Sequence, residues 1–343
     1  MTVGIRGSIA ARMSRSGLLD IALRGAFIIM FALLFAMFSV QSPNFLTGSN
    51  LVNILEGSAI LLVVALALTV VVLSGGIDLS VGVALDFGAW FTVVAMLSWG
   101  LPWHVAVLCG LGGGALIGVL NAVLIVVLRV TPFLATLGTF FIGRSVQQIG
   151  TNGGANINYR NAPEGFQQLA GGSTFGIPNE VWIVAVLALI FYVGLTRSTL
   201  GRRIDAMGVQ DSAARVAGLR TRRYRALVYI GSAVVASIAG ILLLSGLRIY
   251  TPLSGFSYLL DGIAAVFIGA SIHRHTRPNV VGTIIGVLFL SMLNVGLDLV
   301  GIDFNTKAAL RGVVLVVALA LAFTVSRYAY RRATVAAASG KEA

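Results

Sequence analysis

Charged residues and cysteine are both scarce in this chain of 343 residues. Only 10% of the residues are charged, 57% are hydrophobic and the mean hydropathy is +0.95. A soluble domain of this composition would lack the polar surface that keeps it in solution. The single cysteine, Cys109, excludes an intrachain disulfide. The sequence therefore predicts an integral membrane protein surrounded by a lipid bilayer.

The chain also lacks the residues that ATP hydrolysis and metal chemistry require. Its only lysines are Lys307 and Lys341, and no glycine-rich loop ends in Gly-Lys-Ser or Gly-Lys-Thr, the usual phosphate-binding pattern. His273 and His275 have no acidic or cysteine neighbours at metal-ligand spacing. No serine stands in a nucleophile-elbow pattern with a base nearby. We expect no enzyme, no metal site and no cofactor.

Positive charge exceeds negative charge, and the formal net charge is +12. A basic balance can indicate a nucleic-acid partner, but these arginines lie in short connections between apolar runs and not in a folded basic domain. We interpret them as topology signals and expect no nucleic acid.

Long apolar runs make up most of the sequence. A helix needs about 20 residues to cross the hydrocarbon core, and the prolines fall in connections or at helix starts. These runs predict an all-α, polytopic fold of about ten transmembrane helices in one domain covering 1–343. The first run lacks a cleavage site and is expected to be a retained span. The expected helices lie near residues 19–40, 50–73, 79–99, 102–128, 132–149, 180–197, 225–247, 257–272, 279–298 and 306–326.

Lysine and arginine collect in every second connection, the pattern that places those connections in the cytoplasm. Both termini are therefore expected in the cytoplasm, together with the arginine-rich segment 198–224. The polar segment 150–178, rich in glycine and asparagine, is expected to face the outside. There it could cap the structure or meet an external partner.

Small residues mark a helix-packing face. Gly110, Gly114 and Gly118 recur every four residues and share one side of a helix, on which Asn121 also lies. Such a face usually lets another helix approach closely, and a lone intramembrane asparagine usually bonds a neighbouring helix. Packing is the interpretation that we favour, and a substrate-lining role is the alternative.

Three aspartates, Asp78, Asp86 and Asp261, lie in the apolar region. Each would cost about 2.5 to 3.5 kcal/mol at a helix centre, so each needs a partner or water. Asp78 lies in LSGGIDLSVG, where it either caps the next helix at a cytoplasmic turn or belongs to a glycine-broken segment that lines a translocation site. Physical reasoning alone slightly favours the cap.

Segment 198–224 contains an expected short helix as well as its arginines. Its middle, MGVQDSAARVAGL, predicts a short surface helix that begins at Ser212 and stops at Gly218. Small residues on one side and arginines around it suit docking into a groove of a cytoplasmic partner. A positively charged membrane anchor is the simpler alternative.

Four stretches together resemble the membrane subunits of ABC importers for simple sugars, the ribose, xylose, galactose and galactofuranose permeases. They are ALALTVVVLSGGIDLSVG, VTPFLATLGT, AMGVQDSAARVAGL and LLDGIAAVFIGAS, in the order expected for the family. The resemblance implies an ABC-importer permease fold in the bacterial inner membrane that translocates a pentose or hexose. It also implies partners: cytoplasmic ATPase subunits, a periplasmic sugar-binding protein and a second permease subunit, identical or different.

The resemblance further implies which residues act. Those expected to couple the chain to the ATPase are Gly208, Asp211, Ala213, Ala214, Gly218 and Leu219. Those expected near the substrate pathway are Asp78, Ser80, Asn121, Thr136, Thr139 and Asp261. The chain departs from the family in ASIHRHTRPNVVGT, where a glycine-rich turn is usual. It departs again at Asp86, which is either idiosyncratic or adjusts substrate choice.

An ion-coupled secondary transporter is the rival interpretation, with Asp78, Asp86 and Asp261 as proton or sodium relays. The docking helix argues against it, since a self-sufficient transporter needs no ATPase groove.

Overall fold

The computed structural model describes residues 27–272 and 277–303, together with 305–307, 309–310, 312–314, 316–317 and 320. Both termini and their expected orientation therefore lie outside the described residues. So do residues 19–26 of the expected first span, most of the expected last span, and the histidines of ASIHRHTRPNVVGT.

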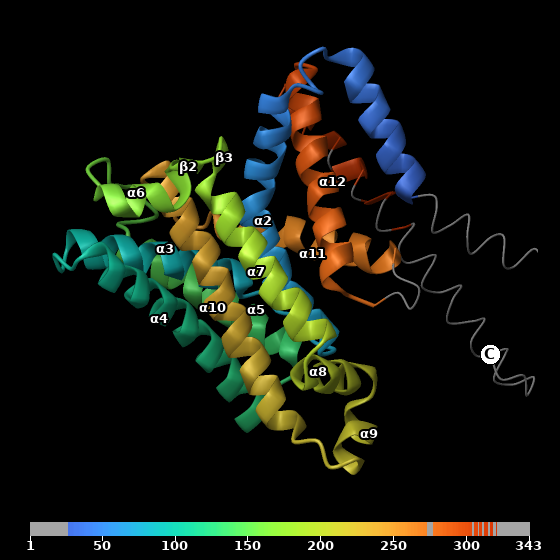
Figure 1. Cartoon of the computed structure of the whole chain (residues 1–343). Helices are drawn as coiled ribbons and strands as arrows, with labels where there is room; N and C mark the ends of the chain where they lie inside the picture. Colours follow the sequence, from blue (N-terminus) through green and yellow to red (C-terminus); the bar gives the residue numbers. More distant parts are fainter. Residues whose placement is uncertain are drawn as a thin grey trace, which may run out of the picture.

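Helices form most of the described residues, as predicted, and four very short strands make two antiparallel pairs (Figure 1). The strands are β1 (Ile157–Asn158) paired with β4 (Ile249–Tyr250), and β2 (Ser173–Thr174) paired with β3 (Ile177–Pro178). The helices are Phe27–Gln41, α2 (Gly48–Leu73), α3 (Val81–Leu97), α4 (Trp103–Ala122) with the π-helical turn η1 (Val123–Val127), α5 (Pro132–Gly150), α6 (Glu164–Gly171), α7 (Asn179–Thr196), α8 (Thr199–Val209), α9 (Asp211–Val216), α10 (Thr221–Leu247), α11 (Gly255–Ile272) and α12 (Val280–Leu299).

Six described helices are long and apolar enough to cross a membrane, namely α2, α4 with η1, α7, α10, α11 and α12. Two further apolar helices, Phe27–Gln41 and α3, are shorter. The expected count of about ten spans is therefore not confirmed in the described part of the chain. A helix does form at the expected span 132–149, but this helix, α5, is not among the six.

α2 is the central helix of the bundle. It begins after Thr47, whose side chain accepts a hydrogen bond from the backbone N–H of Asn50, and it ends at Leu73, with Ser74 as its C-cap. Its 26 residues extend about 39 Å, which exceeds the hydrocarbon thickness of about 30 Å. α10, α11 and α12 pack along it.

The glycine face of α4 packs against α10, as predicted. A Cβ atom at Gly114 would lie 2.5 Å from the Cβ of Ser237, and one at Gly118 would lie 2.6 Å from the Cα of Ile230. The two helices therefore approach so closely that larger side chains would not fit without a shift.

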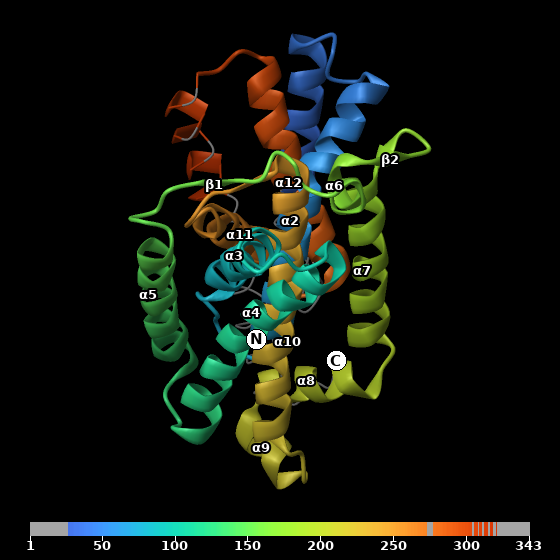
Figure 2. The same cartoon turned by 90° about the vertical axis from the view of Figure 1, so that its left-hand side faces the viewer.

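Segments 150–178 and 198–224 lie at opposite ends of the bundle (Figure 1). The first contains α6, β2 and β3 and is called the capping end here, because Phe166 of α6 is fully buried against the bundle and α6 packs on α10. The second contains α8 and α9 and is called the arginine-rich end. Figure 2 shows α5 standing at one edge of the bundle, between these ends.

Candidate translocation and coupling sites

The connector, residues 74–80, joins α2 to α3 by running through the protein interior. Asp78 and Ser80 are both 0% exposed. Gly75 has φ +82°, a backbone conformation that favours glycine, and a Cβ at Gly76 would collide with a side chain of α10. The irregular backbone that the sequence offered as the second interpretation of LSGGIDLSVG is therefore present inside the protein.

Asp78 also acts as a local cap. Its Oδ1 accepts hydrogen bonds from the backbone N–H of Ser80 at 2.8 Å and from the Ser80 hydroxyl at 2.6 Å. The Ser80 Oγ in turn accepts from Nδ2 of Asn121 at 2.6 Å. Asp78 thus bonds Ser80, the N-cap residue of α3, whereas its place in a translocation site stays a prediction. Asn121 bonds a neighbouring element as expected.

Three buried polar atoms around the connector have no hydrogen-bond partner among the described residues. They are Oδ2 of Asp78, Oδ1 of Asn121 and the hydroxyl of Tyr229, which abuts Gly76. Leaving such an atom unpaired costs about 1–3 kcal/mol. We call Asp78, Ser80, Asn121 and Tyr229 the polar cluster, and its free atoms are suited to hold water or a polar ligand.

Thr136 of α5 contacts the connector directly. Its Oγ1 accepts from the backbone N–H of Leu79 at 3.2 Å, and the same hydroxyl lies 3.0 Å from the carbonyl oxygen of Pro132. Thr139 is also fully buried, but its hydroxyl donates to the carbonyl oxygen of Ala135 within α5 at 3.1 Å. Among the described residues, Thr136 is the one of these two threonines that hydrogen-bonds to the connector.

Asp261 is half-buried on α11. A Cβ at its neighbour Gly262 would contact the side chains of Val64 and Leu68 in the middle of α2. Asp261 therefore belongs to a helix that packs on α2 and that contributes no residue to the polar cluster.

Sequence reasoning missed two residues of the site. Tyr229 contributes a buried hydroxyl to the polar cluster, and Gln147 is a fully buried amide near the end of α5. Gln147 follows Thr136 by eleven residues, which is close to three helical turns and puts both on one face of α5. That spacing was the available signal for Gln147, whereas Tyr229 offered none.

Gly208 of α8 packs against the start of the connector. A Cβ there would collide with the backbone of Leu73 and Ser74, and a Cβ at Gly75 would lie 3.4 Å from the Cα of Gly208. Gly208, expected as a docking residue, therefore joins the arginine-rich end to the connector.

Asp211 anchors α9 to the rest of the protein. It forms ion pairs with Arg215 and, at 3.2 Å, with Arg225 of α10. Partial burial alone would raise the pKa of Asp211, but the hydrogen bond from Arg215 and the charges of both arginines outweigh it and hold the pKa below its ordinary value. Asp211 thus fixes α9 in place.

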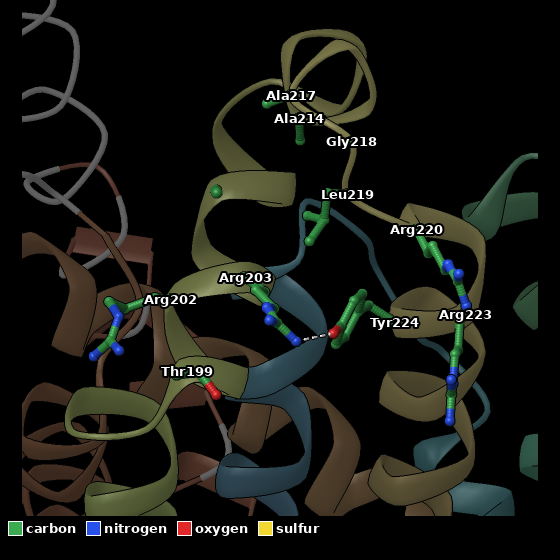
Figure 3. A pocket seen from close by; sticks show the side chains of 11 residues that line it. Thr199, Arg202, Arg203, Ala214, Ala217, Gly218, Leu219, Arg220, Arg223 and Tyr224 are labelled. Atoms are coloured by element: carbon green, nitrogen blue, oxygen red, sulfur yellow. Dashed lines mark hydrogen bonds between the residues drawn. The ribbon is translucent and has the colours of Figure 1, made fainter.

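Of the other residues expected to couple the chain to the ATPase, some are buried and some are exposed. Ala214 is buried, whereas Ala213 is exposed on α9. Gly218 ends the short helix with φ +84°, as its predicted stop requires. Leu219 is half-buried and points into a groove (Figure 3).

This groove lies between α8, α9 and the start of α10 and has a volume of about 680 Å³. Arg203 donates a hydrogen bond to the hydroxyl of Tyr224 across it, and the guanidinium lies 5.6 Å from the centre of the Tyr224 ring (Figure 3). None of the described residues that line the groove is acidic, so this lining is positively charged. Its arginines are Arg202, Arg203, Arg220 and Arg223.

Comparison with known proteins gives the family. Residues 50–319 match the model of the family described as "Branched-chain amino acid transport system / permease component". The ribose import permease protein RbsC of Escherichia coli (strain K12) is 35% identical over 295 residues, which cover 85% of this chain and 91% of that protein. The protein of the same name from Bacillus subtilis (strain 168) is 34% identical over 301 residues, covering 87% and 91%.

A third relative is the galactofuranose transporter permease protein YtfT of Escherichia coli (strain K12), which is 35% identical over 270 residues, or 78% of each chain. These matches, together with six long apolar helices, make the chain a multi-pass protein of the bacterial inner membrane and a transport subunit rather than an enzyme. The chain belongs to the family of ABC-importer permease components that the sequence resemblance indicated.

Proposed function

We propose that this chain forms part of the membrane passage of an ABC importer for a simple sugar of the pentose or hexose class. Its relatives bear the names of ribose and galactofuranose permeases. The importer would also contain separate ATPase subunits, a periplasmic sugar-binding protein and a second permease subunit, the same chain or a different one.

The contact between α8 and the connector carries this proposal. Gly208 packs on Leu73 and Ser74, and Asp78, four residues further along, belongs to the polar cluster. A movement imposed on α8 from outside would therefore reach a buried polar site through backbone contacts. This arrangement suits a passage whose motor is a separate protein.

The arginine-rich end is proposed to face the cytoplasm, and the capping end to face the periplasm. The segment 198–224 holds six arginines, and Arg197 and Arg225 flank it; arginines in short connections favour the cytoplasmic side. ATPase subunits would dock on α9 and the adjoining groove, and the binding protein would dock at the capping end. Both termini would lie in the cytoplasm.

The polar cluster and Thr136 are proposed to lie beside the sugar pathway, with Thr139 and Asp261 near it. The free atoms of Asp78, Asn121 and Tyr229 can exchange hydrogen bonds with water or with sugar hydroxyl groups. Weak contacts of this kind allow release, whereas tight binding would oppose it.

Reconstitution tests this function. Proteoliposomes containing the permease, its ATPase and its binding protein should accumulate radiolabelled D-ribose, D-xylose or D-galactose only when ATP is supplied on the ATPase side. Accumulation driven by a proton or sodium gradient without the ATPase would instead support an ion-coupled transporter that uses Asp78, Asp86 or Asp261.

A further inference from the structure

A second polar pocket lies between α3, α5 and the start of α11, on the capping-end side of the connector. Its volume is about 100 Å³. Asp86 and Gln147 form its buried part, since their exposed fractions are 2% and 0%. The side chains that surround them are Phe140, Arg144, Leu253 and Phe256.

Hydrogen bonds hold the two buried polar residues of the pocket rigidly. Oδ1 of Asp86 accepts from the backbone N–H of Gly255 at 2.9 Å and from the hydroxyl of Ser254 at 3.0 Å. Oε1 of Gln147 accepts from the Tyr250 hydroxyl at 3.0 Å and from the Leu253 backbone N–H at 3.1 Å. These bonds fix both side chains in one orientation before any ligand arrives.

The pocket also contains polar atoms that could hydrogen-bond to a ligand. Nε2 of Gln147 is buried and has no acceptor among the described residues. The hydrogen bonds of normal geometry to Asp86 engage Oδ1, and the Gln147 side chain lies near enough to interact with the same carboxylate. Because a hydroxyl group both donates and accepts, a ligand hydroxyl satisfies an amide N–H and a carboxylate oxygen at once.

Aromatic side chains complete the pocket. The rings of Phe140 and Phe256 have centroids 5.7 Å apart at an angle of 41°, and they offer apolar surface to the C–H face of a sugar ring. The lining holds one carboxylate, Asp86, and one guanidinium, Arg144, so its net charge favours neither an anion nor a cation. A neutral polyol with one apolar face matches this combination.

We propose that this pocket is a sugar subsite that contacts a few hydroxyl groups of the sugar in transit. The inference rests on the proposed function and adds residues to it. A volume of about 100 Å³ equals the space of roughly three water molecules, so the pocket holds one edge of a monosaccharide and not the whole ring. Binding is therefore weak, as a passage requires.

The subsite and the connector share one face of α5. Thr136 contacts the connector, Gly143 packs against Val83 of α3, and Gln147 reaches the pocket. Thr136 and Gln147 are eleven residues apart, which is about 16 Å along a helix. The sugar would therefore meet the subsite first and the polar cluster later on its way to the arginine-rich end.

Saturation-transfer difference NMR tests the subsite directly. The complete permease–ATPase complex in lipid nanodiscs, without binding protein, is mixed with millimolar D-ribose, D-xylose or D-galactose, and the aromatic protons are saturated. We expect transfer to ring protons of at least one sugar in the wild type. Asp86→Asn, which keeps an oxygen for Gly255, and Phe256→Leu should weaken binding about tenfold.

Phe133→Leu serves as the matched control for Phe256→Leu, because Phe133 is an exposed phenylalanine of α5 that does not line the pocket. It should keep the transfer signal. Equal signals in wild type, Asp86→Asn and Phe256→Leu, or no transfer in the wild type, would overturn the subsite. ATP-driven uptake by the same wild-type complex is measured in parallel, and its absence would overturn the proposed function instead.

Discussion

Gly208 of α8 and Gly75 of the connector meet backbone to backbone, with no side chain between them. The Cβ that Gly75 lacks would lie 3.4 Å from the Cα of Gly208, and a Cβ at Gly208 would collide with the carbonyl group of Leu73. Backbone atoms in direct contact cannot slip past one another as flexible side chains can. A displacement of α8 is therefore expected to displace the connector and, with it, Asp78.

Replacing Gly208 with alanine should disturb this contact. The added methyl group has to push the end of α2 away, and overpacking of this kind costs typically about 1–3 kcal/mol. We expect the purified Gly208→Ala protein to melt at a lower temperature than the wild type, and ATP hydrolysis to drive less sugar uptake per ATP.

Gly194→Ala in α7 is the control for this substitution, since a Cβ at Gly194 would meet nothing within 4 Å. It should leave melting and uptake unchanged. A Gly208→Ala protein with the melting temperature and uptake of the wild type would contradict the backbone linkage.

Ala213 offers a cleaner test of ATPase docking. Its side chain is exposed on α9, so tryptophan can be accommodated without disturbing the interior. We expect Ala213→Trp to fold and insert normally but to co-purify with about tenfold less ATPase, because a large side chain keeps the docking surfaces apart. Ala155→Trp at the capping end, also exposed, should co-purify normally. Equal recovery of ATPase with both variants would place the docking surface elsewhere.

Periodicity and composition predicted the helices well. Apolar runs of about 20 residues can satisfy their backbone groups in lipid only as helices, so the positions of α2, α10 and α12 followed from hydropathy. Hydropathy could not decide whether a helix such as α5 crosses the membrane as an apolar span. α5 buries Thr136 and Gln147 against its neighbours, and these polar residues occur in a helix that stands at one edge of the bundle (Figure 2).

The candidate site was predictable only where it is local in sequence. An irregular backbone between α2 and α3 is indicated by residue type alone, because Gly75, Gly76 and Asp78 follow one another closely there. Tyr229 and Gln147 join the site through contacts between distant segments, and the sequence indicates only that Gln147 shares a face of α5 with Thr136, not which residues it contacts. The same limit applies to Gly208, whose close packing on α2 became evident from the structure.

Asp211 leads to a prediction about pH. Its folded-state pKa is lowered by Arg215 and Arg225, so its contribution to stability is fully present above the unfolded-state pKa of about 4 and is lost as pH falls through the lower, folded-state value. The melting temperatures of wild type and Asp211→Asn should therefore differ by a constant amount between about pH 5 and pH 8 and should converge only below about pH 4. A difference that vanishes near neutral pH would show that these ion pairs do not hold α9.

The last prediction separates the two roles of Asp78. Asn at this position keeps an oxygen for the N–H and hydroxyl of Ser80, whereas Ala loses both hydrogen bonds. We expect Asp78→Ala to lower the melting temperature, since a lost cap costs typically about 1 kcal/mol and the freed N–H is buried. Asp78→Asn should melt nearly as the wild type does but import sugar several-fold more slowly, because the free carboxylate oxygen that we propose faces the pathway is replaced by an amide nitrogen.

Uptake by proteoliposomes and thermal melting of the same preparations decide between these outcomes for Asp78. Normal uptake by Asp78→Asn would leave the cap as its only role, and the pathway would then have to be sought along α5. Slow uptake that remains ATP-dependent would support a pathway role without any ion coupling. Slow uptake accompanied by loss of a proton-gradient requirement would favour the ion-coupled alternative, since a proton relay needs an ionisable group and asparagine supplies none.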